Sequence, residues 1–235
     1  MKRSSGFTLL ELLVSIGLLA LLVLTLSMVF SQGLKALHVG YNRAEMYASA
    51  RAALEQMIRE IPTALCDGSA GYPLSGYSSP RFRAGSSGPE IYFIGQVSGA
   101  GQCEVVKLGY WLKKDAGANT GELMRYYVTD DAAGFDLYTS PFQPQFTAGN
   151  SNALAQNITA LTLSYYFRNS MTDPKIFTQT QTWDSTSNAA ANLDAEGNTK
   201  NPDGLPDAVE VSITVQDKLL KERPKTLTVY IPLET

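Results

Sequence analysis

The most constraining feature of the sequence is an apolar stretch near the N-terminus, GFTLLELLVSIGLLALLVLTLSMVF. Between Phe7 and Phe30 the only charged residue is Glu11. A helix over 7–30 would extend about 36 Å, which is enough to cross the hydrocarbon core of a bilayer. The stretch therefore predicts one transmembrane helix. A cleaved secretory signal fits less well, because its apolar region usually runs for only about 7 to 15 residues.

Charge distribution gives the expected orientation and excludes one class of partner. Lys2 and Arg3 precede the apolar stretch, so the N-terminus is expected in the cytoplasm and the rest of the chain outside it. Charged residues make up only 17% of the chain, the net charge is −3, and no basic stripe occurs. This composition argues against direct nucleic-acid binding.

Glu11 needs an explanation, because a carboxylate within a membrane is costly. Insertion of an acid at a helix centre costs about 2.5 to 3.5 kcal/mol, and less near an end, so such a residue is a candidate functional site. No basic residue lies between Arg3 and Lys35 to pair with it. A simple uncleaved anchor would leave Glu11 unexplained. We therefore expect its partner to come from another molecule or from a group created later.

The stretch GFTLLELLVSIGLLALL resembles the N-terminus of type IV prepilins and type II secretion pseudopilins. The matching features are a short basic leader, Gly6, the aromatic Phe7 and Glu11 as the fifth residue after Gly6. The resemblance implies that prepilin peptidase cuts between Gly6 and Phe7 and methylates the new amine of Phe7. In an apolar bundle of helices, that cation would pair with Glu11 of a neighbouring subunit and offset the cost of burying both charges.

Residues 31–62 predict an amphipathic continuation of the helix, which Pro62 is expected to end. Its apolar stripe is expected to pack on the domain that follows. The predicted stripe contains Leu34, Leu37, Tyr41, Ala44, Ala48, Leu54, Ile58, Ile61 and Leu65. The charged faces are expected to carry Arg43, Glu45, Arg51, Glu55, Arg59 and Glu60.

The rest of the chain predicts a β-rich domain. Residues 66–89, rich in Gly, Ser, Pro and Tyr, predict a loop. Alternating apolar residues then predict strands of an antiparallel sheet with one buried face. The alternating positions are Val106, Leu108, Tyr110 and Leu112; Met124, Tyr126 and Val128; Leu161, Leu163, Tyr165 and Phe167; Val209, Val211, Ile213 and Val215; and Leu227, Val229, Ile231 and Leu233.

The expected fold class is α+β and pilin-like, with a long N-terminal helix packed on an antiparallel sheet. The expected organisation is a cytoplasmic leader at 1–6, a transmembrane and filament-core helix at 7–30, its amphipathic continuation at 31–62, and a periplasmic globular domain at 63–235. The protein would be a single-pass inner-membrane protein before its assembly into a filament.

Later segments resemble one subfamily. NITALTLSYYFRN, Trp183 and LPDAVEVSITV are similar to the J-type minor pseudopilins, with the W-type minor pilins as relatives. The resemblance implies a structural subunit of the type II secretion pseudopilus. Its partners would be prepilin peptidase, I-type and K-type minor and G-type major pseudopilins, and the inner-membrane assembly platform. A minor pilin that primes a type IV pilus, and a cleaved, secreted binding module, remain the alternatives.

Catalytic motifs are sparse. The only histidine, His38, falls within the predicted helix, where a surface or interhelical role is expected. Asp130 and Asp131 sit at a predicted turn. No phosphate-binding glycine loop, CxxC pair or HExxH motif occurs. The sequence therefore favours a structural protein rather than an enzyme.

Two further features of the sequence each have two interpretations. The segment LDAEGNTKNPDGLPDAVE supplies oxygen ligands that suit Ca²⁺, although it departs from EF-hand spacing and also fits an ordinary polar loop. The candidate ligands are Asp194, Glu196, Asn198, Asp203 and Asp207. Cys66 and Cys103 form a disulfide in one interpretation, worth about 3 to 4 kcal/mol, and remain separate thiols in the other.

Overall fold

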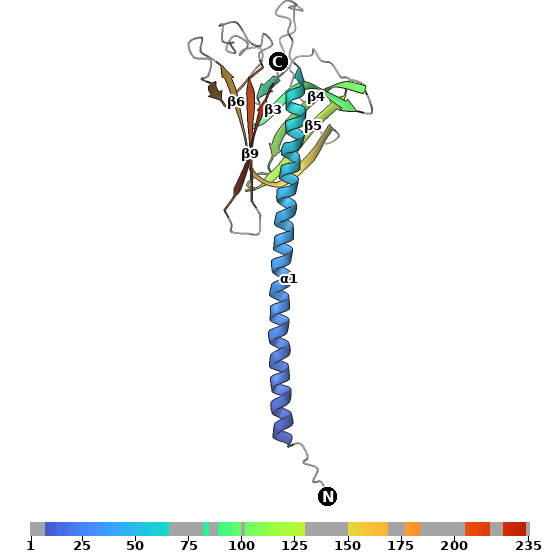
Figure 1. Ribbon diagram of the computed structural model, residues 1–235, viewed down its shortest axis with the longest axis vertical. Helices are drawn as coiled ribbons and strands as arrows, with labels where there is room; N and C mark the ends of the chain where they lie inside the picture. Colours follow the sequence, from blue (N-terminus) through green and yellow to red (C-terminus); the bar gives the residue numbers. More distant parts are fainter. Residues whose placement is uncertain are drawn as a thin grey trace, which may run out of the picture. The chain divides into compact units, whose positions relative to one another are not determined.

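The computed structural model describes residues 8–65, 82–84, 89–99, 102–129, 150–168, 177–183, 205–216 and 223–233. One helix, α1 (Leu9–Glu60), comes first, and a short 3₁₀ turn, η1 (Ile61–Thr63), follows it. The chain divides into two compact units, Met1–Glu45 and Met46–Thr235, and each is described by itself. The described part of the first unit contains α1 up to Glu45, and that of the second contains the end of α1 and the sheet (Figure 1).

The described part of the second unit contains nine strands in one antiparallel sheet. Its main path runs in the order β1-β3-β4-β5-β6-β8-β9, while β2 pairs with β3 and β7 pairs with β6. The α+β, pilin-like arrangement expected from the sequence is confirmed. The strands are β1 (Ala64–Leu65), β2 (Phe82–Ala84), β3 (Glu90–Gly99), β4 (Gln102–Lys113), β5 (Gly121–Thr129), β6 (Ser151–Arg168), β7 (Phe177–Thr180), β8 (Ala208–Val215) and β9 (Lys225–Pro232).

Strand β6 joins the two halves of the sheet. Its first part pairs with β5, and its later part pairs with β8 on one edge and β7 on the other. Between these parts Asn157 has a φ of 61°, a left-handed conformation that asparagine tolerates better than most residues. The amide of Gln216 donates to the Asn157 carbonyl at 3.0 Å. The turn in β6 is thus held by the end of β8.

The core of the second unit lies between the sheet and the end of α1. The helix presents a stripe of buried residues at three- and four-residue steps, which is the spacing of one helical face. Alternate residues of β4, β6 and β8 face the same core, as their sequence pattern predicts. The stripe consists of Met46, Ala50, Ala53, Leu54, Met57 and Glu60, and Ile61 of η1 is also buried.

The predicted apolar stripe of the helix is partly wrong. Leu54 and Ile61 are buried as expected, but Ile58 is 40% exposed and Met57 is fully buried instead. Leu34, Leu37, Tyr41, Ala44 and Ala48 are exposed. The stripe that is buried starts only at Met46 and continues through Ala50, Ala53, Leu54 and Met57, so it follows a different set of positions from the predicted one.

Other predictions need correction in the sheet. The predicted loop at 66–89 contains strand β2, and β3 and β7 were not predicted. In β5, Leu123 is fully buried while Met124 and Val128 are only partly buried. A register shift between Leu123 and Met124 changes the simple alternation there. The face of β5 that carries Arg125 turns toward the helix, because the guanidinium pairs with Glu60.

Candidate assembly site

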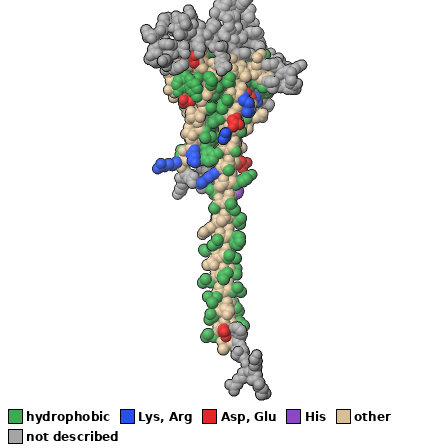
Figure 2. Space-filling model, viewed as in Figure 1, with side chains coloured by type: hydrophobic (Ala, Val, Ile, Leu, Met, Phe, Trp, Pro, Cys, Tyr) green, Lys and Arg blue, Asp and Glu red, His purple; other side chains and the backbone are tan. Residues whose placement is uncertain are grey.

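The first part of α1 has a continuous apolar surface. The large side chains between Leu9 and Phe30 are exposed, and hydrophobic groups cover this segment (Figure 2). Within the described residues, α1 is the one helix long and apolar enough to cross a membrane. A soluble monomer rarely exposes such a large apolar surface, so lipid or other helices must cover it.

Glu11 lies in the first turn of α1. Its amide donates to the Thr8 carbonyl at 3.0 Å and to the Thr8 hydroxyl at 3.3 Å, so Thr8 caps the helix. The order Thr8-Leu9-Leu10-Glu11 matches the sequence of a capping box, a signal that a helix starts here. An acid in the first turn also interacts favourably with the helix dipole. Glu11 therefore lies at a position of the helix where a carboxylate is favoured.

Two hydroxyls of the apolar segment donate to carbonyls within the helix. The hydroxyl of Ser15 donates to the Glu11 carbonyl at 2.7 Å, and the hydroxyl of Thr25 donates to the Leu22 carbonyl at 2.9 Å. Such bonds satisfy hydroxyls where water is absent. Glu11 is the one ionisable group among the described residues up to Phe30. It is therefore the candidate group for a specific contact.

His38 is exposed on α1, where its Nε2 lies 3.3 Å from the side-chain amide nitrogen, Nδ2, of Asn42. These two residues occupy adjacent turns of the same helical face. The contact is local and polar, and it places no acid or nucleophile beside the imidazole. Its geometry fits the surface role expected for His38.

At the other end of α1, a buried ion pair joins the helix to the sheet. Glu60 is only 3% exposed, although it was expected on a charged face, so that expectation is wrong. Arg125 on β5 donates to both of its oxygens, from Nε at 2.9 Å and from Nη2 at 2.6 Å. The hydroxyl of Tyr110 on β4 and the amide of Gln56 also donate to the carboxylate. The guanidinium lies 4.4 Å from the ring centroid of Tyr127.

The pKa shifts describe this cluster. Burial raises the pKa of Tyr110 far above 10.0, and the charge and hydrogen bond of Glu60 raise it further. Burial by itself lowers the pKa of Arg125, but the hydrogen bond and charge of Glu60 outweigh that effect and raise it. The cluster thus favours a neutral tyrosine and a charged arginine. Its two charges compensate each other, which a buried ion pair requires.

An aromatic group fills the core beside β6. Tyr165 is fully buried, and its hydroxyl has no hydrogen-bond partner among the residues that the structure describes. The centroid of its ring lies 6.2 Å from that of the Phe82 ring and 6.3 Å from that of the Trp183 ring. Burial raises the pKa of Tyr165 far above 10.0. Trp183, quoted above for the subfamily resemblance, is a core residue.

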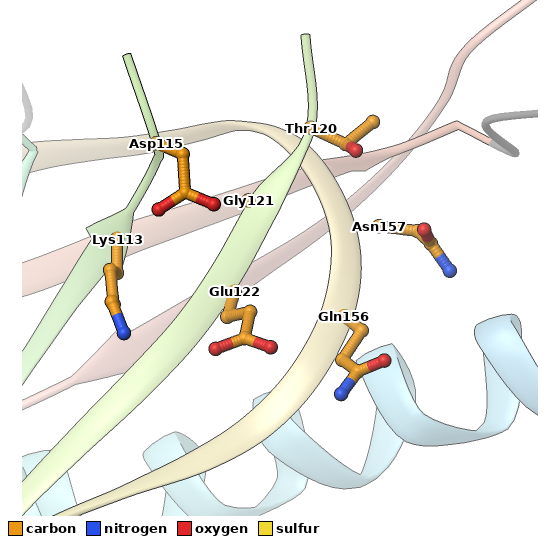
Figure 3. Close-up of a pocket in the computed structure, with 7 residues that line it drawn as sticks. All are labelled: Lys113, Asp115, Thr120, Gly121, Glu122, Gln156 and Asn157. Atoms are coloured by element: carbon orange, nitrogen blue, oxygen red, sulfur yellow. The ribbon is translucent and has the colours of Figure 1, made fainter. Parts of the chain in front are cut away.

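A polar pocket lies where the β4–β5 turn meets the bend of β6 (Figure 3). Its volume is about 270 Å³. The lining contains acids, amides and one amine, so it offers charge and hydrogen bonds rather than a nucleophile with a base. A side chain at position 121 would clash, because its Cβ would lie 2.2 Å from the Lys113 carbonyl oxygen. The lining residues are Lys113, Asp115, Thr120, Gly121, Glu122, Gln156 and Asn157.

Several predicted site residues lie outside the described residues. These are Gly6, Phe7, Cys66, Asp130, Asp131, Asp194, Glu196, Asn198 and Asp203. Cys103 lies on β4, opposite Ser98 of β3. Asp207 is 9% exposed just before β8. Among the described residues no group of three His, Cys, Asp or Glu side chains gathers to hold a metal ion. The calcium site and the disulfide stay predictions.

Comparison with known proteins bears on the N-terminus. Residues 1–27 match the family described as the prokaryotic N-terminal methylation motif. No curated protein matches the chain. The motif indicates a type IV pilin-like protein, either a pilin or a pseudopilin. It implies processing by prepilin peptidase and association with other pilins, and the apolar helix fits membrane anchoring.

We predict that Arg125→Met lowers the free energy of unfolding by about 3 to 5 kcal/mol, because it leaves the Glu60 carboxylate buried without its cation. Glu60→Gln combined with Arg125→Met should recover part of this loss. Urea unfolding of the full chain in detergent micelles, followed by near-ultraviolet circular dichroism, measures both effects. Arg51→Ala is the control, since its exposed contact with Glu55 is worth about 0.5 kcal/mol. Equal losses for Arg125→Met and Arg51→Ala would contradict the anchoring role.

We also predict that stability falls above about pH 10, where tyrosines of the unfolded chain lose protons. Tyr110 and Tyr165 keep their protons when folded because their pKa values are raised. The unfolded state then binds fewer protons, so the free energy of unfolding decreases by about 1.4 kcal/mol per pH unit for each tyrosine.

Urea unfolding at several pH values tests this slope. Tyr165→Phe should reduce this slope and leave stability at pH 7 unchanged or slightly higher, because the lost hydroxyl has no partner within the described part of the chain. Tyr41→Phe, at an exposed helical position, is the matched control. A slope that Tyr165→Phe does not change would contradict the assignment.

Proposed function

We propose that the protein is a minor pseudopilin of J type, a structural subunit near the tip of a type II secretion pseudopilus that supports protein export across the outer membrane. The observation that carries this proposal is the methylation motif at residues 1–27, at the head of an exposed apolar helix that leads into a β-sheet domain. The later segments that resemble the J-type family support the finer assignment.

The apolar helix explains how one chain exists in two environments. Before assembly, lipid covers the side chains from Leu9 to Phe30 in the inner membrane, with the N-terminus in the cytoplasm. In a filament, the corresponding helices of neighbouring subunits cover them. Both environments are apolar, so the transfer costs little hydrophobic free energy.

Glu11 gives the assembly its specificity. The cut after Gly6 creates a cationic, methylated amine at Phe7, and this amine pairs with Glu11 of an adjacent subunit. The positive end of the helix dipole offsets part of the cost of the Glu11 carboxylate before assembly. Because the attraction between charges is strong in an apolar bundle, subunits in the correct register are favoured over others.

The sheet domain selects neighbours. Under this proposal it faces the periplasm and contacts I-type and K-type minor pseudopilins and the G-type major subunit. A minor pilin that primes a type IV pilus for adhesion, motility or DNA uptake is the second candidate, because the same N-terminal motif serves pilins.

We predict that Glu11→Ala leaves cleavage after Gly6 intact and lowers incorporation into filaments at least about tenfold, the effect of losing 1.4 kcal/mol or more. The ratio of protein in sheared filaments to protein in membranes measures this. Glu45→Ala, an exposed acid on the same helix, is the control and should have no effect. Normal incorporation of Glu11→Ala would refute the charge-pairing account.

We predict that deletion in the native host abolishes export of secreted enzymes and leaves surface pili and twitching normal. The medium and the cell surface are assayed in parallel, and a plasmid copy should restore export. Normal export together with lost or sparse pili would move the protein to the minor-pilin class.

A further inference from the structure

The outer face of strands β6, β8 and β9 carries an aromatic–acidic patch, which consists of Tyr166, Glu210 and Tyr230. Side chains alternate between the two faces of a strand. On these strands the neighbours Tyr165, Val209, Val211 and Ile231 are buried in the core, so Tyr166, Glu210 and Tyr230 lie on the opposite face. Figure 2 shows green side chains bordered by acidic ones on this part of the sheet domain.

The patch is held by the sheet. Glu210 lies directly opposite Tyr230 in the register of β8 and β9. The hydroxyl of Tyr166 donates to Glu210 Oε2 at 2.9 Å, and the rings of Tyr166 and Tyr230 have centroids 5.4 Å apart. The Asp207 amide donates to the Tyr166 carbonyl at 2.8 Å, and its carbonyl accepts from Leu233 at 3.0 Å. The ring of Tyr230 remains accessible, because the residue is 51% exposed.

The patch has negative potential. The hydrogen bond that Tyr166 donates to Glu210 raises the pKa of Tyr166, and burial and the charge of Glu210 raise it further. Burial raises the pKa of Tyr230, and the charges of Asp207 and Glu210 raise it further. The Glu210 carboxylate thus raises the pKa of both tyrosines, whereas the charge of Asp207 raises that of Tyr230. Within the described residues, no basic side chain forms an ion pair with Glu210.

The contact between the end of α1 and the sheet contains the completed form of this arrangement. There, Arg125 pairs with the carboxylate of Glu60 while its guanidinium lies 4.4 Å from the ring centroid of Tyr127. The surface patch has the same components, an acid beside an accessible tyrosine, but its arginine is not supplied by the described part of the chain. Arginine suits both components, because its planar group stacks on aromatic rings and donates to carboxylates.

We propose that the aromatic–acidic patch docks an arginine side chain presented by a neighbouring subunit of the assembly. The guanidinium stacks on Tyr230 and donates to Glu210. Tyrosine and arginine are both enriched at protein interfaces, which fits such a contact. The identity of the partner as a subunit rests on the proposed function, whereas recognition of the cation does not.

Fluorine NMR of the full chain in detergent micelles, labelled with 3-fluorotyrosine, tests the proposal. Tyr166→Phe and Tyr230→Phe assign the two resonances. The probe is the peptide acetyl-Gly-Arg-Gly-amide, and its control is the same peptide with neutral citrulline. We expect a saturable shift of both resonances with the arginine peptide alone, titrated to about 20 mM because one such contact supports only millimolar affinity.

Variants isolate the role of the carboxylate. Glu210→Gln should lower the affinity for the arginine peptide at least about fivefold, because a charge-assisted hydrogen bond is lost. Glu122→Gln, the same change at the polar pocket, should leave affinity unchanged. Unshifted resonances elsewhere in the spectrum show that each variant is folded. Three results would overturn the proposal: no saturable shift with the arginine peptide, an equal shift with the citrulline peptide, or an unchanged affinity for the arginine peptide in Glu210→Gln. A deletion that leaves export normal would contradict the secretion role but not this binding.

Discussion

The structure depends on a buried carboxylate at the end of its helix. Glu60 accepts from Arg125 and Tyr110, and these contacts join α1 to two adjacent strands. A buried ion pair contributes little net stability compared with apolar packing, but a broken one is costly. The cluster therefore disfavours other registers of the helix on the sheet. Apolar residues such as Met57 supply the packing, and Glu60 determines where that packing occurs.

The earlier part of the same helix differs from its buried end, because its large apolar side chains are exposed. Up to Phe30 its side chains are apolar and exposed, so this segment needs lipid or other helices around it. Hydroxyls of Ser15 and Thr25 bond within the helix, and Glu11 is the one ionisable group of this segment among the described residues, so it can make a directional, charged contact. Anchoring, assembly and folding are thus assigned to different parts of one element.

Much of the fold follows from periodicity. The apolar run predicts the first part of α1, and strict alternation predicts β4, β6, β8 and β9. Strand β3 was missed because Ile91 to Gly95 are all buried, so no alternation marks it. Glu60 and Arg125 were not predicted as partners, because charged residues are usually exposed and these two lie 65 positions apart. The capping-box order at Thr8 and Glu11 was a readable signal of the helix start.

The central claim is that the mature protein begins with a methylated amine four residues before Glu11. The intact mass of the protein from native membranes tests this most directly. The account predicts loss of residues 1–6 and the addition of one methyl group, located on Phe7 by fragmentation. A protein that retains its leader, or that has lost about 30 residues as an exported protein does after signal cleavage, would contradict it.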